Sequence, residues 1–137
     1  MAYLLDTGFL YSTLNHKERL HSETVEILSS IYEEIILPVP AITETAYLLL
    51  RDLGVKALAT FLEDLPEMNL ILETPTAADY KRAAEILRKY DDANIDFVDS
   101  CIVAIAERLN VTKILTVDRR HFGAFKPRHC AAFEILP

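Results

Sequence analysis

Short apolar runs alternate along the chain with longer stretches in which apolar residues recur at helical spacing. This alternation predicts β-α-β units and a parallel sheet. The apolar runs predict strands near residues 2–5, 34–38, 69–73, 113–117 and 132–136. The amphipathic stretches predict helices near residues 22–33, 41–53, 54–64, 76–90 and 97–110. The sequence therefore predicts an α/β fold with three layers, in which helices flank a central parallel sheet.

Three residues support the predicted helix boundaries. Pro40 suits the first turn of the helix over 41–53, and Gly54 suits the end of that helix. Thr76 is a plausible N-cap for the helix over 76–90. With right-handed crossovers, we expect the strand order 3-2-1-4-5, which places a topological switch point between the first and fourth strands.

Length and composition favour one domain over residues 1–137, because 51% of the residues are hydrophobic and can form a sizeable core. No apolar run approaches the roughly 20 residues that span a bilayer, and the first residues do not resemble a signal peptide. We therefore expect a cytoplasmic protein without a membrane partner. Cys101 and Cys130 lack metal-ligand spacing and are predicted to be reduced thiols.

Four acidic residues occupy positions that an α/β fold brings together. Asp6 and Asp118 directly follow predicted strands, and the carboxyl ends of such strands line the ligand crevice. Glu44 is expected in the first turn of its helix. Asp99 opens a helix whose uncharged stretch from Ser100 to Ala106 must be largely buried. Gathered carboxylates repel one another unless a cation lies between them, and Mg²⁺ or Mn²⁺ prefers such oxygen ligands.

Each acid also has a simpler explanation. Glu44 could gain about 0.3–1 kcal/mol from the helix dipole alone. Asp96 and Asp99 have the spacing of a helix cap and its partner, so Asp96 could be a cap, a ligand or both. Asp6 could close a turn, and Asp118 could be neutralised by the arginines that follow it. The triplet at Asp6 also raises an aspartyl phosphotransferase, a weaker alternative because the second acid usual in that class is replaced by Gly8.

Thr116 lies on the same strand face as Asp118 if the strand alternates, so its hydroxyl could bond a carboxylate. The four histidines show no metal-ligand spacing, and we expect surface or capping roles for them: His16, His21, His121 and His129. Carboxylates without a histidine base fit metal-assisted phosphoryl transfer, in which the ions activate water and stabilise the attacking and leaving oxygens.

The charge distribution suggests where a polyanion could bind. The formal net charge is −7, but residues 107–128 contain six basic and two acidic residues, a local net of +4 that leaves −11 elsewhere. A basic segment beside an acidic centre suits a phosphate backbone, although a basic surface loop is the alternative. The residues of this segment predicted to contact such a phosphate backbone are Arg119, Arg120, Lys126 and Arg128.

Four segments in order resemble the PIN-domain ribonucleases, and more closely the VapC-type toxins of toxin–antitoxin pairs. They are Leu5-Asp6-Thr7-Gly8-Phe9-Leu10, Ile42-Thr43-Glu44-Thr45-Ala46, Asp96-Phe97-Val98-Asp99-Ser100 with the helix after it, and Leu115-Thr116-Val117-Asp118-Arg119-Arg120-His121-Phe122. The resemblance covers nearly the whole chain. It places the family's catalytic, metal-binding acids at Asp6, Glu44, Asp99 and Asp118, with Asp96 as an accessory acid and with Thr7 and Thr116 as supporting residues.

The resemblance implies a PIN-like fold and an endoribonuclease that depends on Mg²⁺ or Mn²⁺ and leaves 5′-phosphate and 3′-hydroxyl ends. It also implies a homodimer and an antitoxin whose C-terminal segment blocks the site. The alternative is a catalytically silent PIN-like scaffold that binds RNA or a protein. The sequence does not name the RNA, because RNA specificity depends on loop shape and splayed bases.

Overall fold

A computed structural model describes residues 1–137 and contains one five-stranded parallel sheet in the order β3-β2-β1-β4-β5. The strands are β1 (Ala2–Leu5), β2 (Glu34–Pro38), β3 (Ile71–Glu73), β4 (Lys113–Leu115) and β5 (Glu134–Leu136). In the centre, Leu4 of β1 is paired with Ile36 of β2 on one side and with Ile114 of β4 on the other. The predicted fold class and strand order are confirmed.

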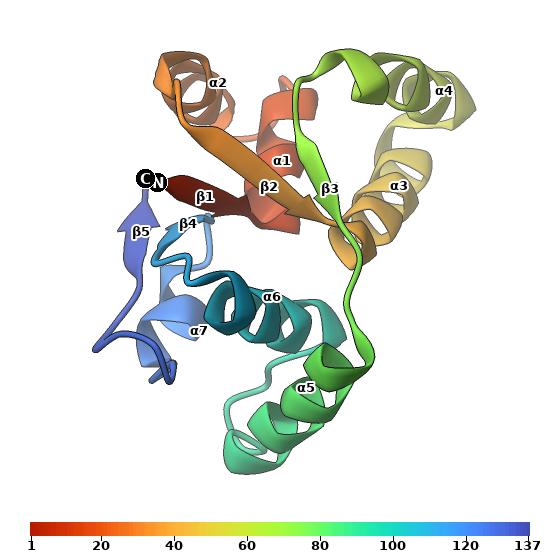
Figure 1. Cartoon of the computed structure of the whole chain (residues 1–137). Coiled ribbons are helices and arrows are strands. Elements are labelled where there is room, and N and C mark those ends of the chain that lie inside the picture. Colours follow the sequence, from red (N-terminus) through yellow and green to blue (C-terminus); the bar gives the residue numbers. More distant parts are fainter.

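Helices flank both faces of this sheet, with α1 and α2 on one side and α6 and α7 on the other (Figure 1). The helices are α1 (Thr7–Leu14), α2 (His21–Ser30), α3 (Val39–Leu53), α4 (Val55–Asp64), α5 (Ala77–Lys89), α6 (Phe97–Leu109) and α7 (Arg119–Ala124), with a short 3₁₀ turn at Leu65–Glu67. Helix α5 packs on α6, and α3 contacts both α1 and α6. No helix combines the length and the apolar character needed to cross a membrane.

The core explains why these segments fold as they do. Apart from its first residue, β1 is buried, as parallel strands covered on both faces usually are. Helix α6 is buried continuously from Val98 to Ala106, which confirms the prediction for its uncharged stretch. The start of α6 therefore lies at a fixed position relative to the ends of the central strands.

The helix boundaries follow the expected local chemistry. Thr76 caps α5 in a capping box with Asp79, and Pro40 lies in the first turn of α3. Gly54 separates α3 from α4 with φ of 92°, in the region where a side chain would be strained. The three boundary predictions are confirmed.

Two helices next to the acids were not predicted. Helix α1 has no clear apolar stripe because most of its residues are buried, and α7 is only six residues long. The predicted strand over 113–117 ends at Leu115, because the chain turns at Thr116 toward α7. Helix α3 starts at Val39, so Glu44 lies in its second turn and the prediction of a first-turn position is wrong. The helix dipole therefore explains the position of Glu44 less well, because its effect falls off beyond the first turn.

Candidate active site

One cavity at the carboxyl edge of the sheet is lined by all the acids that the sequence singled out. Its volume is about 220 Å³, and it receives side chains from the ends of β1 and β4 and from α3, α6 and α7. The titratable lining residues are Asp6, Glu44, Asp96, Asp99, Asp118 and His121. Segments that are far apart in the chain therefore place five carboxylates around one small space.

Asp6 lies at the junction of β1 and α1 and is 6% exposed. Its backbone N–H continues the sheet by donating to the Leu115 carbonyl oxygen at 2.9 Å, and its Oδ2 accepts a 2.7 Å hydrogen bond from the Thr116 hydroxyl. Burial raises the pKa of Asp6 to about 6, and the negative charges of Glu44 and Asp118 add to the rise. The Thr116 bond partly offsets it.

Asp96 and Asp99 form a capping box at the start of α6. Asp96 Oδ1 accepts from the Asp99 N–H at 2.9 Å, and Asp99 Oδ2 accepts from the Asp96 N–H at 3.3 Å. Asp96 is therefore a cap, and it also lines the cavity. Burial raises the pKa of Asp99 to about 8, with further contributions from the charges of Asp96, Asp6 and Asp118. Asp99 thus holds a proton at neutral pH when no cation is bound.

Thr116 connects the two strand-end acids. Its hydroxyl donates to Asp6 Oδ2 and accepts from the Asp118 N–H at 2.9 Å. Asp118 in turn caps α7, since its Oδ1 accepts from the His121 N–H at 3.1 Å. This fully buried threonine therefore fixes Asp6 and Asp118 relative to each other.

The sequence analysis missed His121, whose ring lies in the cavity wall. Its Nδ1 is 2.8 Å from Asp118 Oδ2 and 3.4 Å from Asp99 Oδ2, and its side chain is 24% exposed. Its position three residues after Asp118 on the short helix α7 brings the ring to the cavity. The spacing of three residues between Asp118 and His121 indicates a shared site only when this segment is known to be helical.

The donor set fits a hard divalent cation in its chemistry. Carboxylate oxygens surround the cavity, the buried Thr7 hydroxyl oxygen has no hydrogen-bond partner, and Asp6 and Asp99 have pKa values that a nearby positive charge would lower. No three His, Cys, Asp or Glu side chains are close enough to ligate one ion as they stand. Binding of an ion would therefore require some of these side chains to rotate. Glu44 is half-buried and its carboxylate forms no hydrogen bond, so it can rotate without breaking one.

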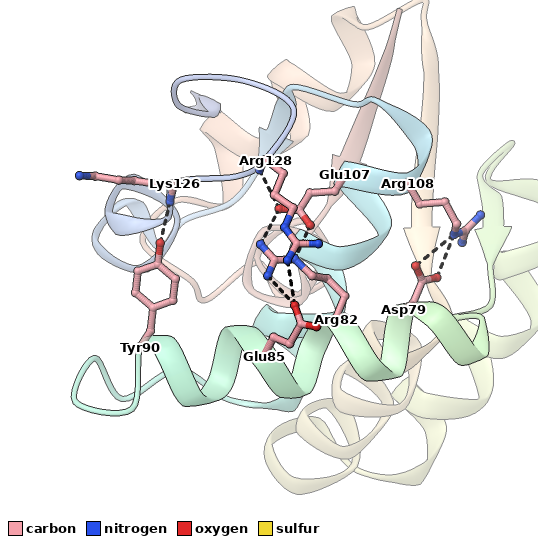
Figure 2. Close-up of polar contacts among 8 residues, drawn as sticks. All are labelled: Asp79, Arg82, Glu85, Tyr90, Glu107, Arg108, Lys126 and Arg128. Atoms are coloured by element: carbon pink, nitrogen blue, oxygen red, sulfur yellow. Dashed lines mark hydrogen bonds and ion pairs between the residues drawn. The ribbon is translucent and has the colours of Figure 1, made fainter.

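The four basic residues predicted to bind RNA do not lie together. Arg119 and Arg120 begin α7, directly after Asp118. Arg128 pairs with Glu85 at 2.9 Å, its N–H donates to Glu107, and the Lys126 N–H donates to the Tyr90 hydroxyl (Figure 2). Glu107 follows Asp99 by eight helical residues, about 12 Å along α6. Arg128 thus lies near the opposite end of α6 from the cavity, whereas the main chain of Lys126 lies beside Tyr90, just after α5.

Close packing at Gly8 supports the geometry of the acids. A Cβ at this position would lie 2.8 Å from Cγ2 of Val117, which stands between Thr116 and Asp118. We expect Gly8→Ala to cost about 1–3 kcal/mol of stability and to lower any cleavage activity, because Val117 must move. Val117→Ala in the same chain should restore both, as judged by thermal melts and rates.

Gly123→Ala is the matched control for this substitution, since a Cβ at Gly123 on α7 meets nothing within 4 Å. It should leave stability unchanged or raise it by up to about 1 kcal/mol through helix propensity. A Gly8→Ala protein that behaves like Gly123→Ala would contradict the packing argument.

Comparison with known proteins agrees with this geometry. The PIN domain family model matches residues 3–126. Ribonuclease VapC26 of Mycobacterium tuberculosis is 31% identical over 134 residues, which cover 98% of this chain and 99% of that protein.

Solved structures with the same fold include a VapC toxin and a VapBC complex. Mycobacterium tuberculosis VapC20, a toxin that cleaves the sarcin–ricin loop, superposes with a TM-score of 0.76 at 21% identity, over 82% of this chain and 86% of that one. Rickettsia felis VapBC2, bound to a promoter DNA fragment, gives 0.73 at 16% identity over the whole of both chains. On its sequence match and family model, the chain belongs to the PIN-domain family and is a homologue of the VapC-type ribonuclease toxins.

Proposed function

We propose that this protein is a metal-dependent endoribonuclease that acts as the toxin of a toxin–antitoxin pair. The observation that carries the proposal is the single cavity lined by Asp6, Glu44, Asp99 and Asp118, together with the accessory acid Asp96. Asp6, Glu44, Asp99 and Asp118 would hold Mg²⁺ or Mn²⁺. A bound cation would supply the positive charge that draws in the scissile phosphate and eases deprotonation of the attacking water.

The protein's own residues would orient that chemistry. Thr116 holds Asp6 and the start of α7 in place, and the Asp96 cap fixes the backbone of Asp99. Thr7 offers a free hydroxyl oxygen at the cavity wall. Release of the Asp99 proton on cation binding would link metal affinity to pH, because a carboxylate must be deprotonated to serve as a ligand.

Cleavage of single-stranded RNA by the purified protein tests this function. We expect activity with Mg²⁺ or Mn²⁺ that EDTA removes, and a loss of more than about 100-fold in Asp99→Asn, since changing even an outer-shell partner costs 10–100-fold. Asp91→Asn, in an exposed loop, is the matched control. A wild-type protein that binds RNA without cleaving it under any of these conditions would support the alternative, a catalytically silent scaffold.

A homodimer is supported by an exposed apolar surface next to the acidic cavity. Tyr47, Leu50, Tyr80 and Phe97 are each 46–62% exposed, and the rings of Tyr80 and Phe97 are stacked with centroids 6.4 Å apart. The surface contains a groove of about 460 Å³ that shares Glu44 with the acidic cavity. Contiguous exposed apolar groups of this kind mark interaction sites.

The double substitution Tyr47→Ser/Tyr80→Ser should therefore shift the protein from dimer to monomer in sedimentation equilibrium. Tyr32→Ser removes an equally apolar ring that is 96% exposed after α2, and it should leave the dimer intact. Dimers that persist in the double variant would place the interface elsewhere.

An antitoxin partner is proposed from relatives that were solved as pairs, including the DNA-bound VapBC complexes of Rickettsia felis and Salmonella typhimurium. In this role the partner would cover the acidic cavity. With RNA as its substrate, the protein would act in the cytoplasm, and we propose that location.

A further inference from the structure

A second cavity shares the lining residue Val117 with the acidic one. Its volume is about 260 Å³. Two arginines line the second cavity from distant parts of the chain. Arg19 comes from the connection between α1 and α2, and Arg119 comes from the first residue of α7.

The two guanidinium groups are not neutralised by carboxylate side chains. Arg119 donates to the carbonyl oxygen of Ile135 at 3.2 Å and to Pro137, and Arg19 forms no ion pair. Glu23 is the one acidic side chain in the lining. The lining side chains therefore sum to a charge of +1, in contrast to the acidic cavity beside it, and the Arg119 guanidinium is also held by main-chain oxygens of Ile135 and of the last residue, Pro137.

We propose that Arg19 and Arg119 together bind one backbone phosphate of the RNA, next to the phosphate that is cleaved. This inference rests on the proposed ribonuclease function. Guanidinium groups match phosphate oxygens in charge and in the geometry of their paired donors. A cavity lined by carboxylates attracts RNA weakly by itself. Positive charge in the adjacent cavity would hold the RNA strand in place where it passes Val117.

The proposal changes the RNA path expected from the sequence. Arg19 is distant in the sequence from the basic segment 107–128, although it lines the same cavity as Arg119 of that segment. The Arg128 side chain is instead paired with Glu85 of α5. The strand would thus run from the acidic cavity toward the connection between α1 and α2.

Equilibrium binding of a single-stranded oligoribonucleotide at several NaCl concentrations tests the subsite, with EDTA present so that the RNA stays intact. The variants are Arg19→Gln, Arg119→Gln and the double substitution. Arg88→Gln, exposed on α5, is the control with the same change of charge. Each single substitution should weaken binding more than the control does and should lower the salt slope by up to about 0.7.

In the double variant, the slope of log affinity against log salt concentration should fall by about 0.7, because both arginines hold the same phosphate. The factor by which affinity drops between about 50 and 200 mM NaCl should then be about 2.6-fold smaller than in the wild type. A loss near 1.4 would mean two separate phosphates and would overturn the shared subsite, as would Arg19→Gln binding like Arg88→Gln. Absence of cleavage by the wild type with Mn²⁺ is a separate result that contradicts the proposed function, since the binding experiment needs no catalysis.

Discussion

Asp99→Asn is expected to raise the melting temperature of the metal-free protein while removing its stabilisation by Mn²⁺. The folded protein keeps a proton on Asp99 up to about pH 8, whereas an unfolded aspartate loses it near 3.8. At pH 7 the raised pKa opposes folding, and asparagine removes this cost. At pH 7, about three units above the unfolded pKa of 3.8, the cost to the free energy of unfolding would be roughly 4 kcal/mol. We expect Asp99→Asn to recover about 1–3 kcal/mol of it, because the substitution also weakens the capping bond to Asp96.

The pH dependence has a definite sign. Between about pH 4 and pH 8 the native state binds more protons than the unfolded state, so the stability of the metal-free wild type falls as the pH rises. In Asp99→Asn this fall should shrink to the part due to Asp6, which ends near pH 6. Thermal melts in EDTA across this range measure both slopes.

Added Mn²⁺ should reverse the order of the two proteins. A ligand that binds the native state stabilises it by RT ln(1 + [L]/Kd), and losing a carboxylate ligand raises Kd. Asp91→Asn should respond to Mn²⁺ like the wild type. A metal-free Asp99→Asn protein that melts lower than the wild type, with a wild type indifferent to Mn²⁺, would exclude the proposed metal site.

Arg108→Gln is expected to produce the largest loss of stability, about 3 kcal/mol. Arg108 Nε lies 2.9 Å and 3.1 Å from the two carboxylate oxygens of Asp79, whose side chain is 3% exposed (Figure 2). Removing one partner leaves a buried charge uncompensated, which typically costs 3–5 kcal/mol. The lower end applies because Asp79 also accepts from the Thr76 N–H.

Denaturant unfolding of a double-mutant cycle checks the cause of this loss. Adding Asp79→Asn to Arg108→Gln should recover part of the stability, because the unpaired charge is then gone. Arg88→Gln on the exposed side of α5 should change little. A double variant no more stable than Arg108→Gln would assign the loss to packing of the arginine stem instead.

The strands and the burial of α6 could be predicted because each follows from a local pattern of apolar residues, whereas the strand order was expected from the right-handedness of β-α-β crossovers. Helices α1 and α7 could not, since α1 is covered on most sides and α7 is too short to show a period. His121 was missed for the same reason. The convergence of Asp6 and Asp118 could be predicted from the parallel sheet. The position of Glu44 within its helix could not, because it depends on where α3 begins.

The basic residues show a different limit of sequence reasoning. A local excess of charge did not reveal that Arg128 is paired with Glu85 or that the Lys126 segment packs by Tyr90, because those partners come from α5 and its C-terminal end. Arg19 gives no such signal in the sequence, because its neighbourhood has no basic excess comparable to that of residues 107–128. Long-range pairing decides which charges remain available.

The hydrogen bond between Thr116 and Asp6 spans 110 residues and has a consequence for synthesis of the chain. Strand β1 emerges first, but its second neighbour in the sheet, β4, is among the last parts to leave the ribosome. Until then the nascent chain lacks Asp118 and the threonine that orients Asp6. The acidic cavity can therefore be completed only when almost all of the sequence has been made.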